Sequence, residues 1–247
     1  MPVAVILAAG MGTRLGSLAA GQPKGLVAIG GEAIIARSVR TLQAAGIRDF
    51  VFVVGWQGDA YRTWCSRHCP AAHLVENAAF ATTGSLASLV IGAAAAPDRD
   101  LLIVESDLLY EDRAPRELLA APARDTILVS GFTGSGDEVW VYPNAAGHLR
   151  ALSKSPRADA EPIGELVGLT RLAAPTVLAL QAAARALPAA AHYEDGLNVL
   201  AAQQPIALRR VADLIWCEID DPAHFERARL AVWPRLGLAE ATTLPTA

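Results

Sequence analysis

VAVILAAGMGTRLG, residues 3–16, joins a short apolar run directly to a glycine-rich loop. The composition of residues 3–7 is typical of a buried strand. The small residues that follow would let backbone N–H groups approach a phosphate or a base. Pro23 then interrupts the chain before any long helix can begin. The segment therefore predicts a strand followed by a long nucleotide-binding loop.

Two familiar phosphate-binding loops do not fit this segment. A dinucleotide fingerprint needs G-x-G-x-x-G opening a helix at once, whereas here the third glycine is displaced. A Walker A loop needs Gly-Lys followed by Ser or Thr, and this chain has Pro23-Lys24-Gly25. What remains is a loop with two cations, Arg14 and Lys24, which suits the binding and polarising of a triphosphate.

Short apolar runs alternate with helical periodicity along the first half of the chain. We expect strands at 3–7, 50–54, 73–75, 101–104 and 126–130, and helices near 35–42, 60–68 and 85–95, the last capped by Thr83 or Ser85. This alternation predicts an α/β fold, Rossmann-like, with a mixed, mostly parallel sheet and helices on both faces.

The pattern changes after residue 130. Residues 131–172 read as a small β-rich insertion, with strands at 139–142 and 166–170, that would cover the acceptor. Helices at 175–186, 193–203 and 222–232 and a strand at 215–219 complete what we treat as a single domain over 1–247.

Composition excludes several classes of partner. The net charge of −4 argues against a nucleic-acid binder, and the apolar runs are shorter than the ~20 residues of a membrane span. Three cysteines and a start without a basic leader favour a reducing cytoplasm. The sequence leaves a monomer and a homodimer open.

Lysine is rare in this chain. Of 21 basic residues only Lys24 and Lys154 are lysines, so the remaining nineteen are arginines. A compact ammonium suits pockets too tight for a guanidinium, and phosphate sites are often of that kind. Codon bias is the alternative explanation for so few lysines.

Acidic residues follow two of the expected strands. Asp107 comes just after the fourth strand, and Asp220 just after the late strand. Carboxylates at the C-terminal edge of a parallel sheet point into the usual ligand crevice, where Mg²⁺ could be held together with substrate phosphates. We therefore expect Asp107 and Asp220 to bind Mg²⁺, and Asp221, which precedes Pro222, to cap the last helix.

The loop L-A-A-G-x-G-T-R-L followed by P-K resembles the nucleotidyltransferase superfamily that joins a nucleoside triphosphate to a phosphorylated acceptor. The resemblance extends over at least residues 3–226 and implies a Rossmann-like sheet of mixed strand order. It implies catalytic roles for Arg14 and Lys24. It also implies nucleotide contacts from Leu7, Ala8, Ala9, Gly10, Gly12 and Thr13.

Residues 76–89, ENAAFATTGSLASL, look like the base-reading segment of the cytidylyltransferases that act on phosphocholine and on 2-aminoethylphosphonate. The segments 136–140, 153–154, 164–168, 193–195 and 216–220 are similar to that branch too. The resemblance implies that Thr83, Gly84 and Ser85 bind the nucleotide and that Lys154 holds the acceptor's phosphonate. The acceptor-binding residues would be Ser106, Glu138, Glu165, Glu194 and Asp195.

The cationic end of the acceptor can be argued physically. A quaternary ammonium favours an aromatic cage, whereas a primary ammonium has three donors for carboxylates. By this resemblance, Val139 and Glu194 stand where the phosphocholine enzymes carry aromatics. This departure favours 2-aminoethylphosphonate, unless tryptophans rebuild a cage. The candidates for that are Trp56, Trp140 and Trp216.

The expected reaction is attack by a phosphonate oxygen on the α-phosphorus of CTP, with release of pyrophosphate. We expect the protein to use Mg²⁺ and to bind neither nucleic acid nor a membrane. Three alternatives stay open: a phosphocholine cytidylyltransferase, a sugar-1-phosphate nucleotidyltransferase and a non-catalytic nucleotide-binding module.

Overall fold

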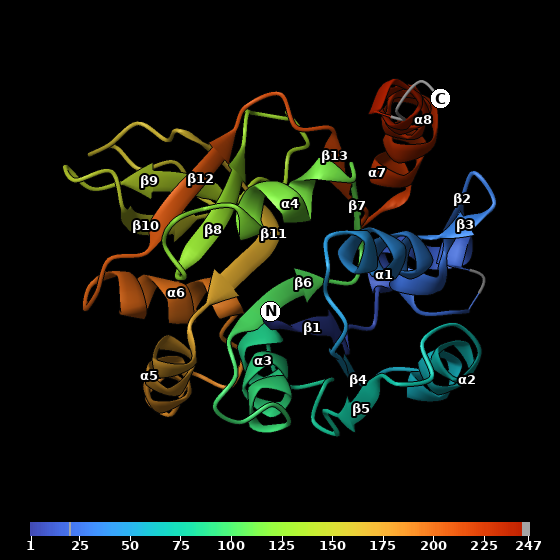
Figure 1. The fold of residues 1–247 in the computed structure, drawn as a ribbon, viewed down its shortest axis with the longest axis horizontal. Coiled ribbons are helices and arrows are strands. Elements are labelled where there is room, and N and C mark those ends of the chain that lie inside the picture. Colours follow the sequence, from blue (N-terminus) through green and yellow to red (C-terminus); the bar gives the residue numbers. More distant parts are fainter. Residues whose placement is uncertain (20, 244–247) are drawn as a thin grey trace.

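A mixed nine-stranded sheet organises the protein in a computed structural model that describes residues 1–19 and 21–243 (Figure 1). Residue 20 and residues 244–247 of the predicted domain lie outside the description. The strand order is β10-β9-β11-β6-β1-β4-β5, and β8 pairs with both β11 and β12. The strands of this sheet are β1 (Val3–Ala8), β4 (Phe50–Val54), β5 (His73–Glu76), β6 (Leu101–Glu105), β8 (Thr126–Ser130), β9 (Trp140–Pro143), β10 (Leu149–Ser153), β11 (Gly164–Leu172) and β12 (Ala207–Val211).

Helices cover both faces of this sheet, as predicted, and two small sheets lie beside it. The helices are α1 (Ile34–Ala44), α2 (Gly58–His68), α3 (Ser85–Ala94), α4 (Arg113–Leu119), α5 (Ala174–Ala184), α6 (Tyr193–Ala201), α7 (Pro222–Arg227) and α8 (Trp233–Thr243), with a π-helical turn η3 (Ala228–Val232) between the last two. The small sheets pair β2 (Ala28–Ile29) with β3 (Glu32–Ala33) and β7 (Leu108–Tyr110) with β13 (Trp216–Glu218).

Strand β1 shows why the sheet needs two helical layers. All of its residues are buried, and successive side chains point to opposite faces. Val3, Val5 and Leu7 join one core with α3, α5 and α6, whereas the residues between them join a second core with α1, α2 and α4. A strand buried on both sides is continuously apolar, which is why residues 3–8 carry no polar side chain.

The sheet has a parallel half and a mixed half, in which β12 pairs parallel with β8 and the other pairs are antiparallel. Strands β6, β1, β4 and β5 run parallel, as the alternation of the first half of the sequence predicts. Strand β11 then pairs antiparallel with β6, β8 and β9. The predicted β-rich portion, residues 131–172, is therefore not a separate decoration, because its longest strand lies in the middle of the main sheet.

The C-terminal segment packs against the glycine-rich loop. A third core joins Leu15 and Val27 near the loop with Ile219, Val232 and Leu236 near the end of the chain. Trp233, the first residue of α8, lies against Gly30, where an added Cβ would come within 2.1 Å of the indole. Figure 1 shows α8 beside the β2–β3 hairpin. The last helices thus support the segment that carries Arg14 and Lys24.

Several elements differ from the sequence-based expectations. The chain forms β7, α4, β10 and β12, none of which we predicted, in segments with short or interrupted periodicity. Neither Thr83 nor Ser85 caps α3, because Gly84 holds the N-cap position. Asp221 does cap α7, since its carboxylate accepts from the backbone N–H of His224 at 2.8 Å.

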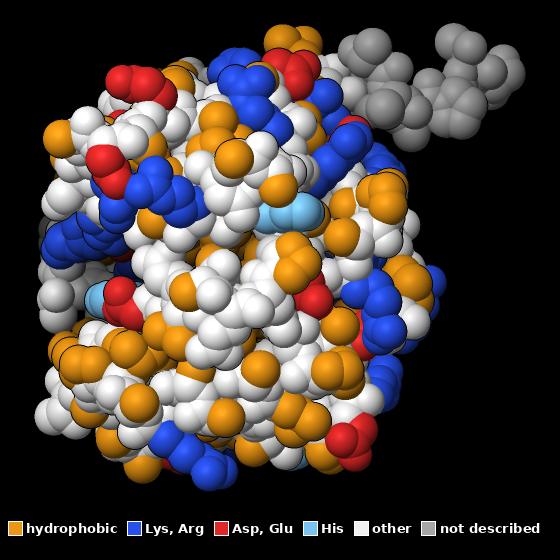
Figure 2. Space-filling view, turned by 90° about the vertical axis from the view of Figure 1, so that its left-hand side faces the viewer, with side chains coloured by type: hydrophobic (Ala, Val, Ile, Leu, Met, Phe, Trp, Pro, Cys, Tyr) orange, Lys and Arg blue, Asp and Glu red, His pale blue; other side chains and the backbone are white. Residues whose placement is uncertain are grey.

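The surface carries both signs of charge. On the face in Figure 2, basic and acidic side chains intermingle above, while hydrophobic side chains gather lower down, at the height of α3 and α5 in Figure 1. Within the described residues, no helix is both long and apolar enough to cross a membrane.

Gly84 provides a test of local packing. Its backbone N–H donates to Ala189 at 2.9 Å, and an added Cβ would come within 2.1 Å of the carbonyl oxygen of Ala191. Because backbone cannot move aside as a flexible side chain can, we expect Gly84→Ala to lower the free energy of unfolding by about 1–3 kcal/mol. Urea denaturation measures the change. Gly10→Ala, which meets nothing within 4 Å, is the matched control, and equal losses in both variants would contradict the interpretation.

Candidate active site

A cavity of about 340 Å³ opens at the C-terminal ends of β1 and β6. Most of the residues predicted for the site line it, including every predicted cation. Two do not: Ala8 belongs to the core on the other side of β1, and Asp195 lies outside the lining. The predicted residues that line the cavity are Leu7, Ala9, Gly10, Gly12, Thr13, Arg14, Lys24, Thr83, Gly84, Ser85, Ser106, Asp107, Glu138, Lys154, Glu165, Glu194 and Asp220.

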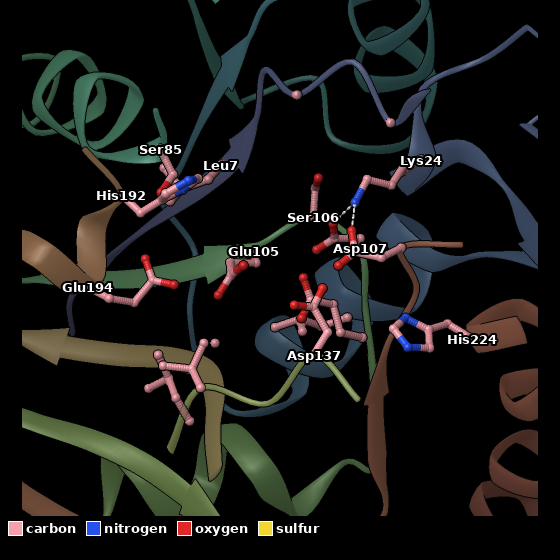
Figure 3. Close-up of a pocket in the computed structure, with 18 of the residues that line it drawn as sticks. Leu7, Lys24, Ser85, Glu105, Ser106, Asp107, Asp137, His192, Glu194 and His224 are labelled. Atoms are coloured by element: carbon pink, nitrogen blue, oxygen red, sulfur yellow. Dashed lines mark hydrogen bonds and ion pairs between the residues drawn. The ribbon is translucent and has the colours of Figure 1, made fainter. Parts of the chain in front are cut away.

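The Lys24 ammonium lies between the two predicted metal ligands. It donates to Asp107 Oδ2 at 2.6 Å (Figure 3). It forms a second, very short ion pair with Asp220 Oδ1. The three side chains are only 15%, 12% and 4% exposed, so their charges must compensate one another. Burial alone would lower the pKa of Lys24, but the two aspartates outweigh it and raise that pKa. The same contacts bring the pKa of Asp220 down to about 2 against the opposing effect of burial.

Two glycines allow close packing at and beside this lysine. The chain turns at Gly12 with φ of +59°, and an added Cβ would lie 2.5 Å from Lys24 Cγ. At Gly25, in the short 3₁₀ turn η2 (Lys24–Leu26), an added Cβ would lie 2.6 Å from the Tyr61 hydroxyl and 2.8 Å from the Ser106 carbonyl oxygen. The glycine-rich loop therefore leaves space for the Lys24 side chain, in addition to allowing any backbone contact with phosphate.

The other two predicted cations meet at an aspartate that we did not predict. Arg14 donates to Asp137 Oδ2 at 2.9 Å, and Lys154 donates to Asp137 Oδ1 at 3.3 Å. Arg14 also reaches Asp220 Oδ2 at 2.8 Å. All three predicted catalytic cations are thus held by carboxylates, in one continuous series of ion pairs from Lys154 to Asp107.

Glu105 and Glu218 complete a group of carboxylates with Asp107. One carboxylate oxygen from each of the three lies within 4.8 Å of the others. Burial, with Glu194 and Asp107 nearby, raises the pKa of Glu105 to about 8, and burial beside Glu105 raises that of Glu218 well above its usual range. Asp107 Oδ1 is buried without a hydrogen-bond partner. An oxygen-rich, partly unsatisfied group of this kind fits a hard divalent cation.

Helix α6 forms the wall opposite Lys24. The Tyr193 hydroxyl donates to Glu105 Oε1 at 2.7 Å, and the Tyr193 backbone N–H donates to Ser85 Oγ at 3.0 Å. Glu194 points toward Glu105 in Figure 3, and its buried Oε2 has no hydrogen-bond partner. Burial raises the pKa of Glu194. The next residue, Asp195, instead accepts from the His192 backbone N–H at 2.8 Å and completes a capping box on α6.

The other two predicted acceptor carboxylates hold the loop 131–139. Both oxygens of buried Glu165 accept hydrogen bonds from Thr133, one from its backbone N–H and one from its hydroxyl. Glu138 accepts from the Gly136 backbone N–H at 3.0 Å. These contacts arrange the loop that carries Asp137, although both glutamates also line the cavity.

Asn77 organises the predicted base-reading segment. Its amide nitrogen donates to Thr83 Oγ1 and to Ser88 Oγ, both at 3.0 Å, and its carbonyl oxygen accepts from the Ala79 backbone N–H. Trp216 lines the cavity, whereas Trp56 and Trp140 do not, so the described part of the chain does not assemble the cage of three tryptophans considered as an alternative.

The sequence matches the MobA-like NTP transferase domain over residues 4–206. The chain belongs to this family. It is 28% identical over 240 residues to a CMP-5'-(3-aminopropyl)phosphonate synthase of Streptomyces rubellomurinus, a match that covers 91% of this chain and 38% of the relative. It is 29% identical over 143 residues to a 2-aminoethylphosphonate cytidylyltransferase of Lancefieldella rimae, covering 56% of this chain and 55% of that relative. The matches thus span less than two thirds of these relatives.

Solved structures confirm the fold of this NTP transferase. A CTP:phosphocholine cytidylyltransferase from Streptococcus pneumoniae superposes with a TM-score of 0.76 at 18% identity, over 93% of this chain and 98% of that chain. The Rossmann-like α/β class inferred from the first loop is therefore confirmed.

Sequence reasoning missed Asp137, Glu105 and Glu218. A signal existed for the two glutamates, because each stands two residues before a predicted metal ligand and alternate residues of an extended chain share a side. Asp137 lies in a glycine-rich loop without periodicity, and nothing local to it indicates the cations that it meets.

The raised pKa of Glu105 predicts a pH dependence of stability. The folded protein keeps a proton on Glu105 up to about pH 8, whereas the unfolded chain loses it near its ordinary value of 4.5. The free energy of unfolding should therefore fall as pH rises through this window. We expect Glu105→Gln, which cannot titrate, to lose less stability than the wild type between about pH 5 and about pH 8.

Urea denaturation at the two pH values, without divalent metal, measures this difference. Glu117→Gln is the control, because Glu117 pairs with Arg209 outside the cavity and its variant should follow the wild type. If Glu105→Gln also followed the wild type, Glu105 would not be the titrating group.

Proposed function

We propose that the protein is a CTP-dependent cytidylyltransferase that transfers CMP to a small phosphonate bearing a primary amine, 2-aminoethylphosphonate above all, and releases pyrophosphate. The observation that carries the proposal is the distribution of charge within one small cavity. Cations suited to phosphates and carboxylates suited to an ammonium both line it.

The carboxylates of the α6 side support an ammonium site. Figure 3 places Glu194 and Lys24 at opposite ends of the view, with Glu105 between them. Glu194 Oε2 is buried and unpartnered, and the pKa values of Glu105 and Glu194 are raised. A primary ammonium would supply both the missing donors and the missing positive charge. A quaternary ammonium has no N–H to give and would leave the Glu194 oxygen without a donor.

The basic residues support the chemistry at phosphorus. A phosphonate oxygen would attack the α-phosphorus of CTP and form a new P–O bond. The bond between the α-phosphorus and the oxygen that bridges it to the β-phosphorus would break, and pyrophosphate would leave. The attacking oxygen is already anionic, so alignment and charge neutralisation carry the catalysis rather than a general base. Arg14 and Lys24 would neutralise the phosphate oxygens, and Lys154 would hold the acceptor in line.

The donor set also supports a role for Mg²⁺. Asp107, Glu105 and Glu218 bring together the carboxylate oxygens that such an ion prefers, and Asp107 Oδ1 lacks a hydrogen-bond partner. Asp220, the other predicted ligand, is held by Lys24 and Arg14 and would have to exchange these partners for the ion. When bound, Mg²⁺ would neutralise phosphate charge as a Lewis acid.

Two named relatives support this choice of substrate. Both relatives described above are named for aminoalkylphosphonate chemistry, and they match this chain at 28% and 29% identity. The structural neighbour named for phosphocholine makes that acceptor the second candidate.

A non-catalytic module is disfavoured, because such proteins would have no need to keep Arg14, Lys24 and Asp107 together in one cavity. A sugar-1-phosphate would leave the Glu194 side without a cationic group.

Pyrophosphate release tests the proposal. We expect turnover with CTP and Mg²⁺ to be at least about tenfold faster with 2-aminoethylphosphonate than with phosphocholine, because only the primary ammonium can donate to Glu194. Lys24→Ala is the inactive control, and glucose 1-phosphate tests the sugar alternative. Preference for phosphocholine would overturn the assignment of the acceptor, and the absence of CMP transfer to any of these acceptors would overturn the proposed activity.

Glu194 should decide the recognition of the amine. We expect Glu194→Gln to raise KM for 2-aminoethylphosphonate about tenfold or more, while KM for ethylphosphonate, which lacks the amine, changes little. Steady-state kinetics with both acceptors measures the contrast. Glu226→Gln, which removes an exposed carboxylate paired with Arg229 outside the cavity, is the matched control. Equal effects on both acceptors would argue against an ammonium contact at Glu194.

A further inference from the structure

Asp137 lies in the loop 131–139, between β8 and β9, and faces the cavity. Its two carboxylate oxygens take different partners: Oδ2 accepts from Arg14 at 2.9 Å and Oδ1 from Lys154 at 3.3 Å. The two cations come from distant parts of the chain, one from the glycine-rich loop and one from the end of β10. A single anion therefore joins the nucleotide side of the cavity to the acceptor side.

The partners of Asp137 form the kind of site that a phosphonate would use. A guanidinium and an ammonium hold one oxygen each of the same anionic group. A phosphonate or a phosphate can be held in this way just as a carboxylate can. Arg14 and Lys154 are 56% and 55% exposed, so these ion pairs are weak and readily exchanged. Lys154 is also close enough for Glu194 to contribute to its raised pKa, which puts this anion site beside the candidate ammonium site.

The loop can release Asp137 without unfolding its neighbours. Gly134 and Gly136 have φ of +66° and +89°, and an added Cβ at either would meet nothing within 4 Å. Glycines in open space can absorb large changes of φ and ψ. The start of the loop is anchored at Thr133 by Glu165, so motion would be confined to the residues after that anchor. A weaker contact joins His224 Nε2 and the Ser135 carbonyl oxygen at 3.3 Å.

From these contacts we propose that Asp137 is an internal competitor for the acceptor, whose carboxylate occupies the phosphonate seat between Arg14 and Lys154 and leaves when the acceptor binds. The inference rests on the proposed function for the identity of the acceptor. It makes Asp137 a residue that sets acceptor affinity rather than a catalytic residue.

Binding of methylphosphonate tests the proposal without turnover. This probe carries the phosphonate but no amine, and a ³¹P NMR titration in the absence of CTP gives its Kd. We expect Asp137→Asn to bind methylphosphonate about threefold to tenfold more tightly than the wild type, because two exposed ion pairs no longer compete. In the Asp137→Asn background, Lys154→Met should abolish this gain.

Asp159→Asn is the matched control. Asp159 is an exposed aspartate that also pairs with two cations, Arg150 and Arg157, but it lies outside the cavity, so its variant changes net charge equally and should bind as the wild type does. Unchanged or weaker binding by Asp137→Asn would overturn the proposal. No binding by either protein would also overturn it, because the seat would then not accept a phosphonate.

Kinetics separates this inference from the proposed function. If both hold, Asp137→Asn lowers KM for 2-aminoethylphosphonate by a similar factor. If the inference alone fails, the wild type transfers CMP but the variant has an unchanged or raised KM. If the proposed function alone fails, neither protein transfers CMP to an aminophosphonate, while the methylphosphonate titration still shows tighter binding by the variant.

Discussion

The compensation of one buried ammonium by two buried carboxylates is the constraint on which the site depends. Lys24, Asp107 and Asp220 are each almost inaccessible, and a buried charge without a partner would cost several kcal/mol. Three separate elements must therefore meet at one point: the turn after the glycine-rich loop, the end of β6 and the segment after β13. The small residues at positions 12 and 25 follow from the same constraint, because the lysine stem passes against one and Tyr61 and Ser106 against the other.

Three cations and three carboxylates of the site compensate one another. Lys154, Asp137, Arg14, Asp220, Lys24 and Asp107 form a continuous series in which cations and anions alternate. Under the proposed function, substrate binding would be an exchange of partners, in which phosphate oxygens replace carboxylates and a divalent cation or an ammonium replaces lysine and arginine. Only the difference in free energy between the contacts within the site and the contacts with the substrates contributes to affinity. Each substrate alone can therefore bind modestly, while selectivity for the correct pair of substrates is high.

The predictable parts of this protein are those whose signal is local. The loop motif and the apolar strand that precedes it indicate the fold, the phosphate-binding end of the sheet and Lys24. The period-two rule explains why Ala8 faces the opposite core from Leu7, and it would have paired Glu105 with Asp107 and Glu218 with Asp220 had we applied it. The position of β11 beside β6 and the meeting of Asp137 with Arg14 depend on contacts between segments distant in sequence, which no local pattern reports.

The pairing of Lys24 with Asp220 has a consequence for synthesis, because the two residues are 196 positions apart. A ribosome releases the chain from its N-terminus, so the parallel strands and their helices can assemble long before the last ligand of the lysine emerges. Until then Lys24 has only Asp107 of its two carboxylate partners, and β13 and the helices after it can dock as a closing step. The complete site can thus form only after Asp220 has left the ribosome.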